Sequence, residues 1–265
     1  MHRNAYVRQG VKKMANSAFV NERITGILEH LKEHRSASVE TLAKMFYVSE
    51  ASIRRDLKEM QKMGMIERSR GGALYYENAD EVSIFVRAEK NAKEKEQTAT
   101  IALKALPDFQ SVFIDNSSTC LALAERMNLA YKTVVTNGLQ IASKLSQKEN
   151  VTIIMPGGEV HYNTNSVTGS ITCDALDRYR VDLMLSSCAA IDDGGTFEHS
   201  PETMQLKRRA FERSRIRYLL VDSSKFGQSA TYCTRKLSDY DGVITNADDK
   251  TANVLKQWGA NVINK

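Results

Sequence analysis

The chain has 265 residues, of which 42% are hydrophobic and 26% charged, and its formal net charge is +5. Residues 1–77 hold 14 lysines and arginines against 9 aspartates and glutamates, whereas residues 78–265 hold 23 of each, so the whole net charge lies in the first segment. The sequence contains no apolar run of transmembrane length and no signal-peptide core, so we exclude a membrane-spanning protein and expect a cytoplasmic one of two domains.

The N-terminal residues 1–20 are expected to form a disordered basic arm. A helix is predicted over Glu22–His34, because four apolar residues fall at helical spacing between Ile24 and Leu31. His30 and His34 in this helix match an H-x-x-E-H metal pattern, but no further ligand clusters with them, and the four cysteines form no CxxC pair. We therefore predict no metal and no cofactor.

A second short helix over Val39–Phe46 and a third that starts after Ser49 predict a helix-turn-helix. Ser49 can cap the third helix, and Ile53, Leu57 and Met60 share one apolar face of it. The opposite face and its flanks are polar and basic, which suits the major groove of DNA, although a merely solvated face is the alternative. The residues predicted to contact DNA from this helix are Ser49, Ser52, Arg54, Arg55, Lys58 and Lys62, with Arg55 reading a base edge.

Residues Met65–Tyr76 predict a β-hairpin with Arg68 and Arg70 near its tip. Such a hairpin forms the wing of a winged helix-turn-helix and places arginines on the phosphate backbone. Together with the excess of positive charge, it predicts a DNA-binding domain over residues 21–77 whose partner is double-stranded DNA.

A linker is predicted over residues 78–84, then a long helix over 85–106 that ends at Pro107. Apolar runs of strand length alternate with helical stretches from there to the C-terminus, which predicts an α/β domain over 85–265 with a mainly parallel, doubly wound sheet. The predicted strands are Ser111–Asp115, Thr133–Thr136, Val151–Met155, Asp182–Cys188, Arg217–Asp222, Gly242–Thr245 and Asn261–Asn264. The predicted helices are Cys120–Met127, Leu139–Leu145, Ile171–Tyr179, Glu202–Arg213 and Lys250–Trp258.

Polar loops follow the carboxyl ends of five of these strands, where parallel sheets bind ligands. They are Asp115–Thr119, Thr136–Gly138, Pro156–Glu159, Ala190–Glu198 and Asp222–Lys225. Each loop alone contains the residues of an ordinary turn. Five such loops at the carboxyl edge of one sheet, which we call the rim, predict a ligand pocket. Their hydroxyl, amide and lysine groups favour a phosphorylated or carboxylated small molecule.

The order of these motifs resembles the DeoR family of bacterial transcription regulators. The resemblance rests on Ala43–Leu57, which contains Ile-Arg-Arg-Asp-Leu, on Arg70–Ala73, and on Asp222-Ser-Ser-Lys-Phe-Gly227, and it covers about residues 20–250. Glu159 departs from the pattern, because the family often has arginine there, and Asn116 stands where glycine or serine is commoner.

The resemblance implies a regulator, more often a repressor than an activator, of a sugar-metabolism operon. Its second domain would resemble ribose-5-phosphate isomerase in fold, bind a phosphorylated sugar effector and form a homodimer or homotetramer. The effector-binding residues implied are Asn116, Ser117, Ser118, Thr119, Thr136, Asn137, Gly157, Gly158, Asp192, Lys207 and Lys225.

Two other functions stay open at this point. The chain could be a constitutive DNA-binding protein whose second domain only oligomerises. It could also be a sugar-phosphate isomerase, for which Asp192, Asp193 and Glu198 offer carboxylates. The sequence lacks the glycine-rich lysine loop of ribose-5-phosphate isomerase, so we predict that the protein is not an enzyme.

Overall fold

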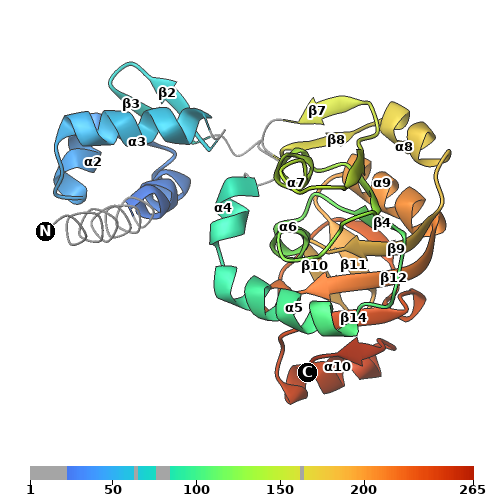
Figure 1. The fold of residues 1–265 in the computed structure, drawn as a ribbon. Helices are drawn as coiled ribbons and strands as arrows, with labels where there is room; N and C mark the ends of the chain where they lie inside the picture. Colours follow the sequence, from blue (N-terminus) through green and yellow to red (C-terminus); the bar gives the residue numbers. More distant parts are fainter. Residues whose placement is uncertain (1–22, 63–64, 76–83, 162–163) are drawn as a thin grey trace, which may run out of the picture. The chain divides into compact units, whose positions relative to one another are not determined.

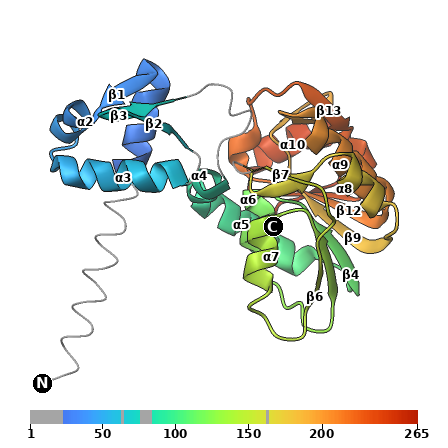
Figure 2. The same cartoon turned by 90° about the horizontal axis from the view of Figure 1, so that it is seen from above.

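The computed structural model of the chain describes residues 23–62, 65–75, 84–161 and 164–265. Contacts between Cα atoms divide the chain into two compact units, Met1–Ser83 and Ile84–Lys265, which Figures 1 and 2 show as separate folds. The predicted arm over 1–20 lies outside the described residues, as does the predicted linker apart from Ile84.

The first unit is a winged helix-turn-helix, as predicted. Its elements are a helix over residues 23–34, β1 (Ser36–Ser38), α2 (Val39–Met45), α3 (Glu50–Lys62), β2 (Glu67–Ser69) and β3 (Gly72–Leu74). The strands form an antiparallel sheet in the order β1-β3-β2. Strand β1 was not predicted, because three residues between two helices carry too little pattern to indicate a strand.

The core of the first unit confirms the predicted helical phase of α3. Ile53, Leu57 and Met60 are fully buried, and they share the unit's core with Leu31 and Leu42 of the two preceding helices. The Ser49 side chain accepts a hydrogen bond from the amide of Ser52 at 3.2 Å, so Ser49 caps α3 as the sequence indicated.

The second unit contains a seven-stranded sheet in which every neighbouring pair is parallel, in the order β15-β14-β12-β9-β4-β5-β6. These strands are β4 (Ser111–Ile114), β5 (Thr133–Thr136), β6 (Thr152–Ile154), β9 (Val181–Ser186), β12 (Ser214–Val221), β14 (Gly242–Thr245) and β15 (Val262–Ile263). All seven predicted strands are confirmed, with bounds shifted by no more than a few residues.

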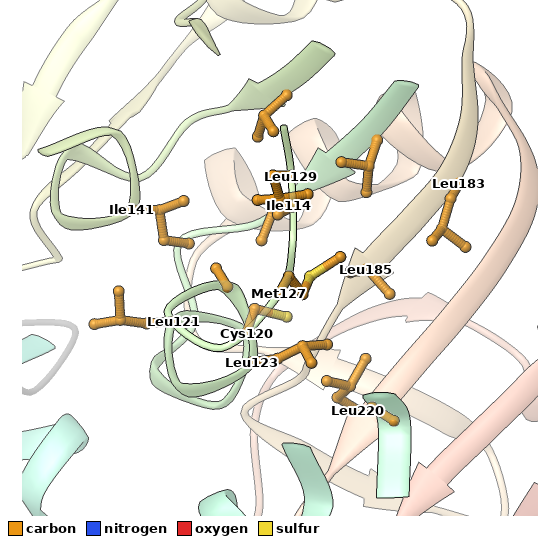
Figure 3. Packing of buried hydrophobic residues seen from close by; sticks show 14 of the residues in the cluster. Ile114, Cys120, Leu121, Leu123, Met127, Leu129, Ile141, Leu183, Leu185 and Leu220 are labelled. Carbon is orange, nitrogen blue, oxygen red and sulfur yellow. The ribbon is translucent and has the colours of Figure 1, made fainter. Parts of the chain in front are cut away.

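Helices cover both faces of this sheet, which makes it doubly wound. They are α5 (Ala92–Ala105), α6 (Ser118–Ala124), α7 (Leu139–Leu145), α8 (Ser170–Leu176), α9 (Pro201–Glu212) and α10 (Asp249–Gln257). Val112 and Ile114 of β4 pack with α5, α6 and α7 in one core, part of which Figure 3 shows. Phe113, between them, points to the other face and packs with α8, α9 and α10.

The predicted long helix over 85–106 is wrong, because it is two helices. α4 (Ile84–Glu89) ends before Asn91, whose φ of 56° is left-handed and interrupts the helical hydrogen bonds, and α5 begins at Ala92. Asparagine tolerates this conformation better than most residues, but the charged sequence around it gives no helix-stop signal.

Among the described residues of the second unit, five short strands outside the main sheet were not predicted. The hairpin of β7 (Glu159–His161) and β8 (Ser166–Thr168) stands apart, while β10 (Ala190–Asp192), β11 (Gly195–Glu198) and β13 (Tyr232–Arg235) form a three-stranded antiparallel sheet. Two 3-10 turns, Ser223–Lys225 and Leu237–Asp239, complete the unit.

Candidate functional site

The solvent-facing side of α3 carries the predicted basic residues. Arg54, Arg55 and Lys58 are exposed, as is Ser49 at the helix start, and Ser52 is partly exposed. Arg54 donates to Glu50 at 2.7 Å, one helical turn away, so part of its charge is balanced on the surface. The Lys62 side chain lies outside the described part of the chain, so its predicted phosphate contact stays a prediction.

The β2–β3 hairpin places Arg68 and Arg70 on its surface, both exposed. Gly71 has a φ of 85°, which the tight turn requires, and a Cβ on Gly72 would lie 2.2 Å from the carbonyl oxygen of Ala37 in β1. The two glycines after Arg70 are therefore explained by the turn and by the close approach of β1. They hold the arginines at the tip of the wing.

The aspartate of the Ile-Arg-Arg-Asp-Leu element has an internal role. Asp56 is buried and accepts two hydrogen bonds from Arg23, from Nε at 2.6 Å and from a terminal nitrogen at 3.1 Å. The Arg23 guanidinium and the Asp56 carboxylate tie the first helix to α3. Sequence reasoning assigned Asp56 no partner, because 33 residues separate the two.

The main sheet of the second unit reverses its winding direction between β4 and β9. The chain runs from β4 outward through β5 and β6, then returns and builds β9, β12, β14 and β15 on the other side. Ligands of such sheets bind at the carboxyl ends of the strands beside this reversal. Here those ends carry Asp115 and Asn116 after β4, and Ser187 after β9.

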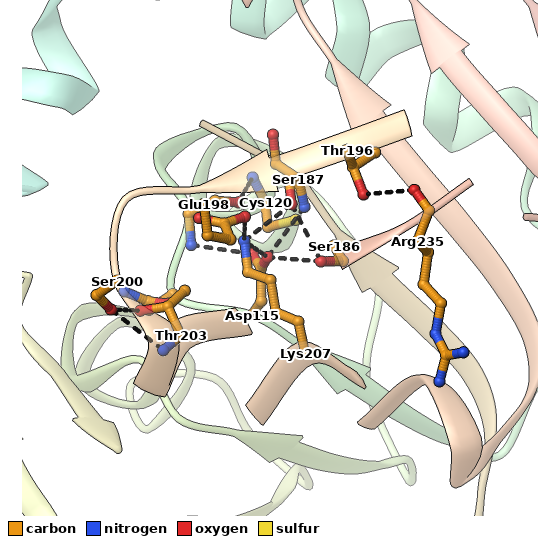
Figure 4. A network of polar contacts seen from close by, with 12 residues as sticks. Asp115, Cys120, Ser186, Ser187, Thr196, Glu198, Ser200, Thr203, Lys207 and Arg235 are labelled. Carbon is orange, nitrogen blue, oxygen red and sulfur yellow. Dashed lines mark hydrogen bonds and ion pairs between the residues drawn. The ribbon is translucent and has the colours of Figure 1, made fainter. Parts of the chain in front are cut away.

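A buried network of charged side chains lies at these strand ends, as Figure 4 shows. The Lys207 ammonium, on α9, lies 3.0 Å from Asp115 and 2.6 Å from Glu198, and it donates to the carbonyl oxygen of Ser187 at 2.8 Å. Asp115 also accepts from the Ser186 hydroxyl at 2.8 Å and from the Ser187 amide at 2.9 Å. All three charged side chains are at most 5% exposed.

Burial by itself would raise the pKa of the Asp115 carboxyl. The Lys207 ammonium and the hydrogen bonds from Ser117 and Ser187 outweigh that effect and lower its pKa to about 2. The Asp115 and Glu198 carboxylates together hold the pKa of Lys207 above its ordinary value, against the effect of burial. Lys207 was predicted to supply charge to the effector, but two internal carboxylates already balance its charge.

The other predicted residues of the rim lie close together above the β4 and β5 ends. Ser117 caps α6 by accepting from the Cys120 amide, and Thr119 donates to Asp222 at 3.2 Å. The Asn137 amide group donates to Asn116 at 3.3 Å. Residues Asn116, Ser117, Ser118, Thr119, Thr136 and Asn137 are all buried.

Three buried oxygens near this rim have no hydrogen-bond partner among the described residues. They are Oδ1 of Asn137, Oγ1 of Thr168 in β8, and Oγ of Ser187. The β7–β8 hairpin brings Thr168 close, because the Val167 amide donates to the Asn137 carbonyl at 2.8 Å. Buried polar atoms are nearly always bonded, so these three oxygens are unused hydrogen-bonding groups that a polar ligand or water can bond.

Structural roles of their own explain two of the four remaining predicted residues, Gly158 and Asp192. A Cβ on Gly158 would lie 2.0 Å from the Thr172 hydroxyl, so packing already requires glycine there, whereas a Cβ on Gly157 would meet open space. Asp192 is exposed and accepts from the Gly194 amide at 2.8 Å, which shapes the β10–β11 turn. Lys225 is partly exposed in the first 3-10 turn.

Comparison with known protein families identifies the family of this chain. The DeoR-like helix-turn-helix domain matches residues 23–79, and the DeoR C terminal sensor domain matches residues 90–247. The chain belongs to the DeoR family. It is a DNA-binding transcription regulator with an N-terminal helix-turn-helix and a C-terminal sensor domain.

Curated members of the DeoR family cover almost the whole chain. The glycerol-3-phosphate regulon repressor of Escherichia coli is 33% identical over 228 residues, 85% of this chain and 90% of the relative. The L-fucose operon activator of Haemophilus influenzae is 32% identical over 86% of this chain and 92% of the relative. The transcriptional repressor GlcR of Bacillus subtilis is 30% identical, with 86% and 89% covered.

Among solved structures, ribose 5-phosphate isomerase A of Methanocaldococcus jannaschii aligns with a TM-score of 0.38 and 14% identity, over 51% of this chain and 55% of the isomerase. The described part of this DeoR-family chain contains no group of three potential metal ligands. No helix among its described residues is long and apolar enough to cross a membrane.

Sequence reasoning about this DeoR-family chain placed the Ala190–Glu198 loop on the rim but missed Ser186 and Ser187. Serines after a strand also occur in ordinary turns, and the charged partners of Ser187, Lys207 and Asp115, are 20 and 72 residues away. One signal was available, because Ser186 and Ser187 lie near the carboxyl end of the predicted strand Asp182–Cys188, which the structure places beside β4 at the sheet's reversal.

Proposed function

We propose that this DeoR-family protein represses a sugar-metabolism operon and that a phosphorylated sugar or a related phosphorylated metabolite binds the rim of its sensor domain and changes its affinity for operator DNA. The proposal rests on the three unpartnered buried oxygens of Asn137, Thr168 and Ser187. The names of two relatives, a glycerol-3-phosphate regulon repressor and an L-fucose operon activator, agree with an effector of this class.

The same rim supplies groups for both parts of such an effector. Hydroxyls of Ser118 and Thr119 and the Asn116 amide stand over the β4 end, and the Lys225 ammonium lies beyond Asp222 in the adjoining loop. Unlike Lys207, Lys225 is partly exposed and has no carboxylate within ion-pair distance among the described residues. We therefore assign the charge that meets the phosphate to Lys225 rather than to Lys207.

Ligand binding is tested first by the melting temperature of the wild-type protein with phosphorylated and unphosphorylated compounds, and then by two adjacent serine variants. We expect sn-glycerol 3-phosphate or a hexose phosphate, at one hundred times its Kd, to stabilise the protein by about 2.7 kcal/mol, a melting shift of several degrees at roughly 2–4 °C per kcal/mol. The matching unphosphorylated compounds should give much less. A thermal-shift series over these compounds measures both effects.

In Ser187→Ala the unliganded protein should melt at an unchanged temperature, because its Oγ has no partner among the described residues, while the ligand-induced shift falls. Ser186→Ala is the matched control. It removes a bond to Asp115 and should lower stability by about 1–3 kcal/mol while leaving the ligand-induced shift intact.

No melting shift with any phosphorylated compound would contradict the proposal and favour a domain that only oligomerises. Conversion of the compound to an isomer would favour the enzyme.

For the DNA-binding face, we expect Arg55→Ala to weaken operator binding by about 1–3 kcal/mol and to blur specificity at one base position. Lys58→Ala, one turn away on the same exposed face, should weaken all sequences alike and reduce the salt slope by roughly one unit. Binding titrations against operator and scrambled DNA at several salt concentrations separate the two roles. Equal losses on both DNAs for Arg55→Ala would contradict its assignment to a base edge.

A further inference from the structure

Lys95 is a buried lysine that the rim described above does not include. It lies in the first turn of α5, is 4% exposed, and its Nζ donates to the carbonyl oxygens of Arg87 and Lys90. These carbonyls belong to the end of α4 and to the residue that follows it. The Lys95 ammonium therefore caps α4 across the break at Asn91.

The surroundings of Lys95 contain an excess of positive charge. Burial lowers the pKa of Lys95 to about 8; the Asp222 carboxylate opposes this change, and the neighbouring cations Lys225, Arg87 and Lys90 add to it. Asp222 is the residue that accepts the Thr119 hydroxyl at the rim. Lys95 thus lies within electrostatic range both of the α4 carbonyls and of the rim loops.

Hydrogen bonds and packing connect the same region mechanically. The Thr98 hydroxyl of α5 donates to the Glu94 carbonyl at 3.0 Å and lies 3.4 Å from the side-chain oxygen of Asn246. The same Asn246 oxygen accepts from the Ser223 amide, next to Asp222, at 2.8 Å. α4 and α5 both pack on α6, the helix that begins with Ser118 and Thr119. α4 is also the first element of the second unit, directly after residues 76–83 that lead from the first unit.

We propose that Lys95 is a positioning residue that couples the effector rim to α4: in the unliganded protein its ammonium holds the end of α4, and an anion bound beside Asp222 draws the ammonium away and releases that helix end. This inference rests on the proposed function, since it needs an anionic effector at the rim. Its physical basis is competition for one buried ammonium between neutral carbonyl oxygens and a phosphate, which makes the stronger charge-assisted hydrogen bonds. Release of α4 then changes the start of the sensor unit, the element that follows the first unit in the chain.

The test compares full-length wild type with Lys95→Met and Lys95→Gln, whose side chains are one heavy atom shorter than that of lysine and carry no charge. Lys148→Met is the matched control, because Lys148 also caps a helix end, donating to the carbonyls of Ala124, Glu125 and Met127 at 2.8–3.1 Å, but at the far end of α6 from the rim. Amide hydrogen exchange over residues 84–91 and operator affinity are measured with and without sn-glycerol 3-phosphate and inorganic phosphate.

In wild type we expect a bound phosphate compound to speed exchange over residues 84–91 and to change operator affinity at least fivefold. Both Lys95 variants should exchange fast there without any compound, and their operator affinity should respond less than twofold. Lys148→Met should respond as wild type does. A Lys95 variant that binds the compound and keeps the full operator response overturns the inference alone, as does unchanged exchange over 84–91 in either variant. If neither compound binds wild type and the wider series also gives no shift, the proposed function itself fails.

Discussion

Replacing Lys207 by methionine is expected to lower the free energy of unfolding by about 3–5 kcal/mol. Methionine fills a similar volume, so the loss comes from charge rather than from a cavity. Asp115 and Glu198 would remain almost fully buried without their cation, and the Ser187 carbonyl would lose its donor. Equilibrium unfolding in urea, followed by far-UV circular dichroism, measures the difference.

Arg209→Met is the control, because it removes another cation from the same helix. Arg209 pairs with Asp177, but both side chains are about a third exposed and Arg213 keeps a second bond to the same carboxylate. That pair should be worth about 0–1 kcal/mol. Equal losses for Lys207→Met and Arg209→Met would mean that the buried network contributes no more than a surface ion pair.

The acid side of the stability curve should change with Lys207. Asp115 has its pKa lowered from 3.8 to about 2, so its contribution is present above pH 4 and is lost as the pH falls toward 2. Without the Lys207 ammonium, burial raises the pKa of Asp115 above its unfolded value, so the stability deficit of Lys207→Met relative to wild type should be largest near neutral pH and should shrink as the pH falls and the carboxyl is protonated. The same urea titrations, repeated between pH 3 and pH 7, check this direction.

Leu57→Ala is expected to cost the first unit about 2–5 kcal/mol. Leu57 lies on the buried face of α3 and is fully buried. A unit this small has a low free energy of unfolding, so a loss of this size matters. Operator binding should therefore fall sharply at 37 °C, although the buried Leu57 side chain cannot itself contact DNA. Leu57→Met, which nearly conserves volume, should cost less than about 1.5 kcal/mol and keep most of the binding.

The second unit serves as an internal reference for Leu57→Ala. Its melting shift with a phosphorylated compound should match that of wild type, because the two units form separate cores. Hydrogen exchange resolved by segment separates the two effects. Wild-type protection over α3 in Leu57→Ala would contradict the packing account of this helix.

The sequence predicts the elements whose pattern is local and leaves out those that depend on distant partners. The apolar face of α3 and the Ser49 cap repeat within one or two helical turns, and both are confirmed. The seven strands of the parallel sheet are also predicted, because each contains a short apolar run between turn residues. The interruption at Asn91 escapes such reasoning, since no proline or glycine marks it.

The candidate site follows the same division. The polar loops after β4 and β5 could be found from sequence, because parallel strands bring their carboxyl ends to one edge. The balance of charge among Lys207, Asp115 and Glu198 could not, because Lys207 looks like one more member of a basic helical run. Burial alone distinguishes it from its neighbours Arg208 and Arg209, and burial at this position depends on how α9 packs on the sheet.

The central claim is that a phosphorylated metabolite at the sensor rim changes the affinity of this DeoR-family regulator for DNA. The direct measurement is a titration of full-length protein on a DNA fragment that the protein itself selects from a random pool. The titration is made with and without the compound that gives the largest melting shift. We expect the dissociation constant to change by a factor of about 5–150, corresponding to about 1–3 kcal/mol of coupling. An unchanged dissociation constant at saturating compound would contradict the account.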